Sequence, residues 1–166
     1  SLLVLFGLES TRRRPVEQNL VGSREITTGE RKRLEELLNS DSDGLSEMVT
    51  DYLIDLHRKV STTEVGFRRK NMPALLLRFF QDMSAILGHC YRALKSGGQA
   101  MIVIGDNKIE IDGIYERIPT TNFVEEIALR CGFTPLERID ISVTTENLVH
   151  IKNAITENVV LRLKRP

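Results

Sequence analysis

A short apolar run that follows a long amphipathic segment constrains this chain most. Five apolar residues at 100–104 lie between the pair Gly97-Gly98 and Gly105. A run of this length between glycines is typical of a strand buried on both faces of a parallel sheet. Before it, apolar side chains recur every three to four residues from position 73 to 94, which predicts one long helix. The chain is therefore expected to have an α/β fold.

Three more elements are predicted after this strand. A helix is expected at 123–131, capped by Thr121 or Asn122, with Gly132 placed for a left-handed C-cap. Strands are predicted at 136–143 and 158–164, where apolar and polar side chains partly alternate. The order helix, strand, helix, strand, strand predicts one right-handed crossover followed by an antiparallel last strand, which is an incomplete doubly wound sheet.

The first 72 residues are expected to form an extended and helical segment, and residues 73–166 the sheet-bearing part of the same compact unit. Residues 8–28 are polar and irregular, as in an extended surface segment. Thr27 and Glu30 fit a capping box that begins a short helix, and a second amphipathic helix is predicted at 45–60. A chain of 166 residues is long enough to bury one sizeable core.

Charge and cysteine usage exclude several classes of protein. Lysine plus arginine equals aspartate plus glutamate, 23 each, so any binding to nucleic acid or anionic lipid must be local. No apolar run approaches the roughly 20 residues that span a bilayer, and no secretory leader is evident, so a cytoplasmic location is expected. Cys90 and Cys131 are isolated thiols without metal-like spacing, and no residue is assigned a catalytic or metal-binding role.

Residues 78–107, RFFQDMSAILGHCYRALKSGGQAMIVIGDN, resemble the core of DNA amino-methyltransferases. That family pattern runs from an aromatic residue and Asp-Met through a helix to Arg-x-Leu-Lys-Pro-Gly-Gly and a strand that ends in Gly-Asp. Here Ser96 replaces the proline. The resemblance implies the C-terminal half of a Rossmann-like S-adenosylmethionine-dependent methyltransferase sheet, with a seventh, antiparallel strand inserted between strands five and six. Val21-Gly22-Ser23-Arg24 matches the same proteins more loosely.

Two loops of that family do not occur in this sequence. The family's donor-binding Phe-x-Gly-x-Gly loop and its Asn/Asp/Ser-Pro-Pro-Tyr catalytic loop have no counterpart, and the pair Gly97-Gly98 follows a helix instead of a strand. The resemblance thus implies methyl transfer to adenine N6 or cytosine N4 of DNA, of the restriction-modification kind, by the parent protein. The chain alone is expected to be inactive and to bind the donor negligibly.

Asp106 and Asn107 are the candidates for the rim of a base pocket. They follow the predicted buried strand, and open α/β sheets bind ligands beyond the carboxyl ends of their strands. A methyltransferase that flips its target base would place the base there. The alternative is a local turn in which these side chains bond nearby backbone amides.

Compact basic runs are the candidates for contact with DNA phosphates, within an N-terminal region that could approach the duplex as an insertion. The alternative is an ordinary solvated charged surface. The candidates are Arg12, Arg13, Arg14, Arg24, Arg68, Arg69 and Lys70.

Other functions stay open from the sequence. The chain could be a non-enzymatic binding or assembly module on a degenerate methyltransferase fold, or a fragment of an enzyme that methylates RNA or a small molecule. The strand at 100–104 is expected to lack a neighbour on one side. An uncovered apolar edge favours self-association, so a homodimer, or a cover supplied by the N-terminal segment, is predicted.

Overall fold

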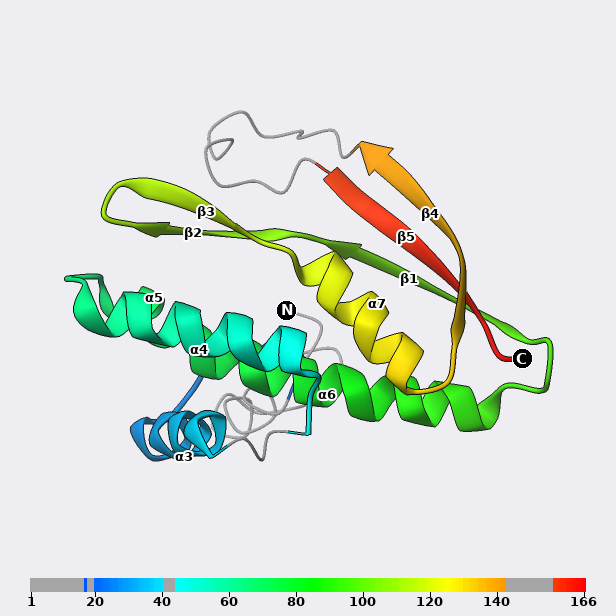
Figure 1. The fold of residues 1–166 in the computed structure, drawn as a ribbon, viewed down its shortest axis with the longest axis horizontal. Coiled ribbons are helices and arrows are strands. Elements are labelled where there is room, and N and C mark those ends of the chain that lie inside the picture. The colour runs from blue at the N-terminus through cyan, green and yellow to red at the C-terminus, as the bar shows by residue number, and fades with distance from the viewer. Residues whose placement is uncertain (1–16, 18–19, 41–43, 143–156) are drawn as a thin grey trace, which may run out of the picture.

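The computed structural model describes residues 17, 20–40, 44–142 and 157–166. Figure 1 shows these residues as a layer of helices against a layer of antiparallel strands. In chain order the elements are α3 (Thr28–Asn39), α4 (Glu47–Thr62), α5 (Phe67–Lys70), α6 (Met72–Ala93), β1 (Gln99–Gly105), β2 (Asn107–Ile111), β3 (Ile114–Ile118), α7 (Thr120–Arg130), β4 (Thr134–Ser142) and β5 (Glu157–Lys164).

The helices begin and end close to where the sequence signals place them. The Thr27 side chain accepts a hydrogen bond from the Glu30 amide at 3.2 Å, which confirms Thr27 as the cap of α3, while the Glu30 carboxylate accepts a hydrogen bond from Arg78 at 2.8 Å. Pro73 lies in the first turn of α6, as expected. Gly132 has φ +100°, and the Phe133 amide bonds back to the Ala128 carbonyl at 3.1 Å, which confirms the C-cap of α7. The one-turn helix α5 lies between the helices predicted at 45–60 and 73–94, where no element is predicted.

The turn between α6 and β1 depends on both of its glycines. Gly97 has φ +77°, a conformation that side chains disfavour. A Cβ on Gly98 would lie 2.8 Å from the Lys95 carbonyl oxygen. The Gly97 amide donates to the Arg165 carbonyl at 2.8 Å, which joins this turn to the end of β5. The turn therefore holds the beginning of β1 beside the end of β5.

The three longest strands form one sheet in the order β1-β5-β4. Strand β5 is antiparallel to both neighbours: Val103 pairs with Val160, and Ile139 pairs with Val160 from the other side. The predicted insertion of an antiparallel last strand between the other two is thus confirmed. Because β1 and β4 are both antiparallel to β5, they run in the same direction, joined through α7.

Two expectations about this sheet are wrong. The strand at 100–104 was expected to lie in a parallel sheet, but every strand pair among the described residues is antiparallel, because β5 separates the two strands that share a direction. The strand β1 is also not buried on both faces, since Met101 is 66% and Val103 64% exposed. The helices lie on one side of the sheet (Figure 1), so alternate residues of β1 face solvent.

Strands β2 and β3 form a separate hairpin that the sequence analysis did not predict. The turn holds Asp112 at φ +52° and Gly113 at φ +76°. Ile109 and Ile118 are buried on the inner side of the hairpin. Two ion pairs attach the hairpin to the helices: Lys59 to Glu116 at 3.0 Å and Arg69 to Glu110 at 2.5 Å.

A single hydrophobic cluster joins the helices to the covered face of the sheet. Phe123 of α7 lies between Tyr52 of α4, at 5.0 Å between ring centroids, and Phe80 of α6, at 5.5 Å. Leu161 and Leu163 of β5 are fully buried on the same side. Among the described helices, none combines the length and apolarity needed to cross a membrane.

Candidate functional site

The predicted site lies where β1 ends and the hairpin begins. Asp106 follows Gly105 directly, and Asn107 is the first residue of β2. Helix α7 begins at Thr120, immediately after β3 returns to this point. The carboxyl end of β1, the base of the hairpin and the amino end of α7 therefore meet at Asp106.

Asp106 is engaged by two donors. Its Oδ1 accepts a hydrogen bond from the Thr121 amide at 2.9 Å, and its Oδ2 lies 2.5 Å from Arg117 Nε. Its side chain is only 13% exposed. A carboxylate at the amino end of a helix is stabilised both by unpaired amides and by the helix dipole. Asp106 thus caps α7 and fixes the base of the hairpin.

The prediction that Thr121 or Asn122 caps α7 is therefore wrong. The N-cap position is Pro119, which has no capping side chain, and Thr121 and Asn122 already lie inside the helix. Because Asp106 supplies the acceptor from a distant part of the chain, the local pattern around Thr121 could not reveal it. The arrangement also differs from a turn in which Asp106 would bond its own neighbours.

The polar groups beside Asp106 are largely buried. Asn107 Nδ2 donates to Thr120 Oγ1 at 3.4 Å, and Thr120 and Thr121 are both buried. The Thr121 hydroxyl is buried and has no hydrogen-bond partner among the described residues. Asp106 and Asn107 are thus brought together at the strand end, as predicted, while a role in binding a base stays a prediction.

Below the hairpin lies a group of charged side chains centred on Lys59. Its ammonium group contacts Asp55 at 2.9 Å and Glu116 at 3.0 Å, and these hydrogen bonds raise the pKa of Lys59. The neighbouring Tyr52 hydroxyl is buried without a partner among the described residues. Burial, together with the charge of Glu116, raises the pKa of Tyr52 to about 12. The phenol is therefore a neutral group wedged between the helices and the hairpin.

The basic candidates divide into three groups. Arg68 and Lys70 are exposed on α5, whereas Arg69 is ion-paired with Glu110. Arg24 is exposed in the segment that precedes α3. The run Arg12, Arg13 and Arg14 lies outside the described residues. No hydrogen bond or ion pair joins Arg24 to the α5 residues in the described part of the chain, and their role in binding stays a prediction.

The candidates predicted from the sequence do not include the residues on the outer face of the hairpin. Lys108 and Arg117 pair directly across the strands, and Glu110 pairs with Tyr115. The signal was present, because Asp112-Gly113 between two alternating runs is a strong hairpin pattern. The Asp-Met pair of the methyltransferase-like motif lies elsewhere, on α6, where burial raises the pKa of Asp82.

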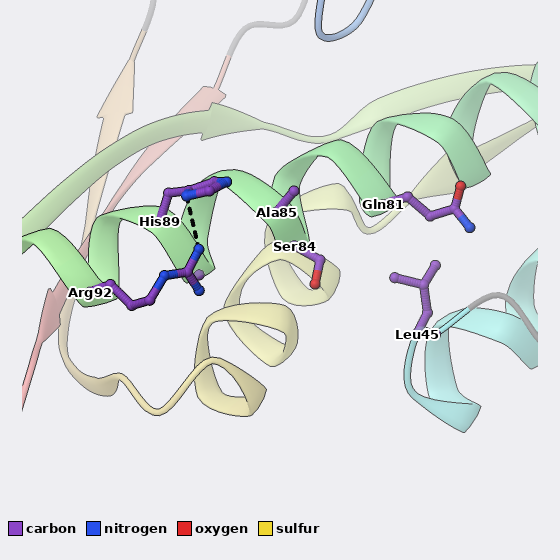
Figure 2. A pocket seen from close by; sticks show the side chains of 8 residues that line it. Leu45, Gln81, Ser84, Ala85, His89 and Arg92 are labelled. Carbon is purple, nitrogen blue, oxygen red and sulfur yellow. Dashed lines mark hydrogen bonds between the residues drawn. The ribbon is translucent and has the colours of Figure 1, made fainter.

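A shallow hollow of about 500 Å³ lies along α6 (Figure 2). Small side chains of α6 line it, and Leu45 from the segment before α4 faces them. Arg92 Nη2 lies 2.8 Å from His89 Nδ1 at one end. None of the predicted site residues lines this hollow.

Comparison with known proteins gives structural similarity over part of the chain. No protein-family model and no curated protein matches the chain. Three crystal structures of a provisionally assigned DNA modification methylase from Thermus thermophilus are similar over part of the chain. The selenomethionine form has a TM-score of 0.44 and 20% identity over 53% of this chain.

The other two structures of that protein give closely similar values. The complex with S-adenosyl-L-methionine has a TM-score of 0.46 and 20% identity over 55% of this chain, and the third structure has 0.43 and 18% over 60%. The chain corresponds to less than two-fifths of that protein, 37% to 39% of its length. The similarity is partial and decides neither activity nor substrate.

Proposed function

We propose that this chain is part of a DNA amino-methyltransferase that transfers a methyl group from S-adenosylmethionine to adenine N6 or cytosine N4. One observation carries the proposal. Two parts of the methyltransferase-like motif lie at the two ends of one strand: Lys95-Ser96-Gly97-Gly98 forms the turn before β1, and Gly105-Asp106-Asn107 begins with the last residue of β1. The antiparallel β5 then lies between β1 and β4, as the resemblance implies.

In this proposal the site residues shape the rim of the base pocket instead of taking part in the chemistry. Ligands of α/β sheets bind beyond the carboxyl ends of strands that run in the same direction, and Asp106 directly follows the last residue of β1. Asp106 is held rigidly by Arg117 and the Thr121 amide. A rigid rim suits a pocket that receives a flipped base, because misplacement of the base would cost rate.

The described residues do not fit the methyl donor. The Asp106 carboxylate at the carboxyl end of β1 already accepts hydrogen bonds from Arg117 and from the Thr121 amide. The only adjacent glycines, Gly97 and Gly98, lie at the opposite end of β1 and are used by the turn. The donor site, and the groups that would accept hydrogen bonds from the target amine, are therefore proposed to come from residues outside this chain.

The direct test uses the full-length gene product that contains this chain. The product is incubated with DNA and methyl-labelled S-adenosylmethionine, and the digested DNA is analysed by mass spectrometry for N6-methyladenine and N4-methylcytosine. Label in either base is the expected result, while this chain alone transfers none. Label confined to RNA or to a small molecule would refute the choice of substrate.

A second test measures whether this chain alone binds the methyl donor. Calorimetric titration with S-adenosylmethionine is expected to show no binding at micromolar concentrations. A micromolar dissociation constant, equivalent to about 8 kcal/mol, would show that the donor site lies within the chain.

The second candidate is a non-enzymatic assembly module. The exposed face and the outer edge of β1 favour it, because Met101 and Val103 are exposed and β1 has a strand partner on one side only within the described sheet. An unpaired strand edge is a template for association with another chain. In this case the chain forms a homodimer and the full-length product transfers no methyl group.

A further inference from the structure

The outer face of the β2–β3 hairpin places two cations side by side. Lys108 and Arg117 pair directly across the antiparallel strands, so their side chains project on the same face. Asp106 offsets the charge of Arg117 at 2.5 Å. In the described part of the chain no acid forms an ion pair with Lys108, which is exposed. Like charges opposite each other are unfavourable unless an anion joins them.

An exposed aromatic ring lies next to these cations. Tyr115 is 57% exposed and projects on the same face as Arg117, which follows it two residues later in β3. Lys108, Tyr115 and Arg117, with Glu116 between them, line one shallow hollow of about 490 Å³. Glu116 itself is ion-paired with Lys59 at 3.0 Å. The hollow therefore combines a solvent-facing phenol ring with basic groups at its border.

Helix α5 extends this surface. Arg69 of α5 reaches Glu110 on the same face of the hairpin, with 2.5 Å between Nη2 and Oε2. The neighbouring Phe67 is 69% exposed, which is unusual for a phenylalanine, and Arg68 and Lys70 are exposed beside it. Among the described residues neither Arg68 nor Lys70 forms an ion pair. We call these six residues the hairpin–α5 surface: Phe67, Arg68, Lys70, Lys108, Tyr115 and Arg117.

The charges on this surface leave a local excess of cations. Three acids of the hairpin region, Asp106, Glu110 and Glu116, are each bound to a basic side chain. Two exposed acids lie nearby in sequence, Glu64 before α5 and Asp112 at the hairpin turn. They are fewer than the three exposed cations Arg68, Lys70 and Lys108, which form no ion pair within the described part of the chain. Because the whole chain is neutral, this excess is a local feature.

We propose that the hairpin–α5 surface binds an unpaired segment of a DNA strand. Lys108, Arg68 and Lys70 contact phosphates, and an unstacked base lies on the ring of Tyr115. Basic groups that follow the backbone, combined with exposed aromatic rings, are the chemistry by which proteins hold single strands. The choice of DNA over RNA rests on the proposed function, whereas the choice of an unpaired strand rests on the exposed rings.

The surface is joined to the proposed base pocket through Asp106. This residue bonds Arg117 on the hairpin and the first turn of α7, so a strand bound along the hairpin would end at the carboxyl end of β1. A base that has left the duplex would thus be held beside the pocket rim.

The test measures binding of a fluorescein-labelled single-stranded DNA 20-mer by anisotropy at several salt concentrations, without methyl donor. Y115A is expected to weaken binding about fivefold or more, and Y115F to bind like the unaltered protein, because the ring is retained. K108A is expected to weaken binding and to make the slope of log K against log salt shallower by about 0.7, the value for one phosphate of a single strand.

The matched control is K95A. Lys95 is also exposed, and it lies in the turn at the other end of β1, so its loss changes the net charge equally but should leave affinity unchanged. Equal weakening by K95A and K108A, unchanged binding by Y115A, or tighter binding of a duplex than of the single strand would each overturn the proposal. Because methyl transfer is measured separately on the full-length product, failure here is distinguishable from failure of the proposed function.

Discussion

Asp106 shows how one residue can serve both the fold and a site. The sequence places it after a strand, where ligands of α/β sheets bind. The structure adds that its two carboxylate oxygens bond Arg117 and the Thr121 amide. These partners lie 11 and 15 residues away in sequence, so no local pattern could indicate them. Position along the chain was predictable here, whereas the partners depended on how the hairpin folds back.

Replacement of Asp106 by alanine is expected to lower the free energy of unfolding by about 1.5–3 kcal/mol, because charge-assisted hydrogen bonds are lost and a partly buried amide is left without an acceptor. Urea denaturation measures the change. The control is D51A, which removes an exposed aspartate of α4 and should change the free energy of unfolding by no more than about 0.5 kcal/mol. Equal stability of D106A and D51A would show that Asp106 has no structural role.

Tyr52 gives a prediction about alkaline pH. Burial raises its pKa to about 12 from 10.0, so the folded protein holds the phenol proton more tightly than the unfolded chain does. The stability contributed by this difference is complete below pH 10 and is lost as the pH rises towards 12. Y52F removes a buried hydroxyl that has no partner among the described residues. Its stability should therefore equal or exceed that of the unaltered protein at pH 7.

The measurement is urea denaturation at intervals from pH 8 to 12. Y52F should lose less stability between pH 10 and 12 than the unaltered protein. Y115F, which removes the hydroxyl of an exposed tyrosine, serves as the control and should decline as the unaltered protein does. Parallel curves for Y52F and the unaltered protein would show that ionisation of Tyr52 does not contribute to the loss of stability above pH 10.

At the scale of elements, the long helix and the strand after it were predictable because their signals are local. The apolar spacing of 73–94 and the glycine turn after it determine α6 and β1 to within one residue at each end. The exposure of Met101 and Val103 was not predictable in the same way. An apolar run indicates that a strand can be buried on both faces, but burial depends on whether the described fold supplies a layer for each face.

The β2–β3 hairpin is the element that the sequence analysis overlooked. Its Asp-Gly turn and its alternating strands are local signals, but β2 begins only two residues after β1 ends, so the sequence pattern alone does not separate the hairpin from the end of that strand. With the hairpin in place, Lys108 and Tyr115 become neighbours on one face, although they are seven positions apart in sequence. The candidate DNA surface could therefore not be found from basic runs alone.

At the scale of the whole molecule, the sheet has one covered and one open face. The open face carries a row of apolar side chains, Val103, Val160 and Ile139, directly opposite one another on the three strands. Met101 and Ile141 extend this row along the strands and are also exposed. Contiguous exposed apolar surface of this kind marks an interaction site or a liability for aggregation.

The open face and the outer edge of β1 together favour a homodimer. Strand β1 contains no charged residue, no proline and no bulge in its pairing with β5, so it lacks the features that protect edge strands from pairing. Two copies related by a two-fold axis could pair their β1 edges antiparallel and continue the apolar row across the junction. Light scattering is expected to show a dimer that dissociates on dilution.

V103K tests this directly, because the side chain at position 103 faces solvent in a single copy and its replacement should leave the fold intact. When two β1 edges pair antiparallel, a lysine at position 103 would lie on the same open face as its symmetry-related copy, and like charges close together across paired strands are destabilising. V103K is therefore expected to be monomeric at concentrations at which the unaltered chain is dimeric. M48K, which places the same charge at an exposed apolar position of α4, should remain dimeric. A strictly monomeric unaltered chain, or equal dissociation by V103K and M48K, would rule out association through β1 and leave the open face to be covered by residues outside this chain.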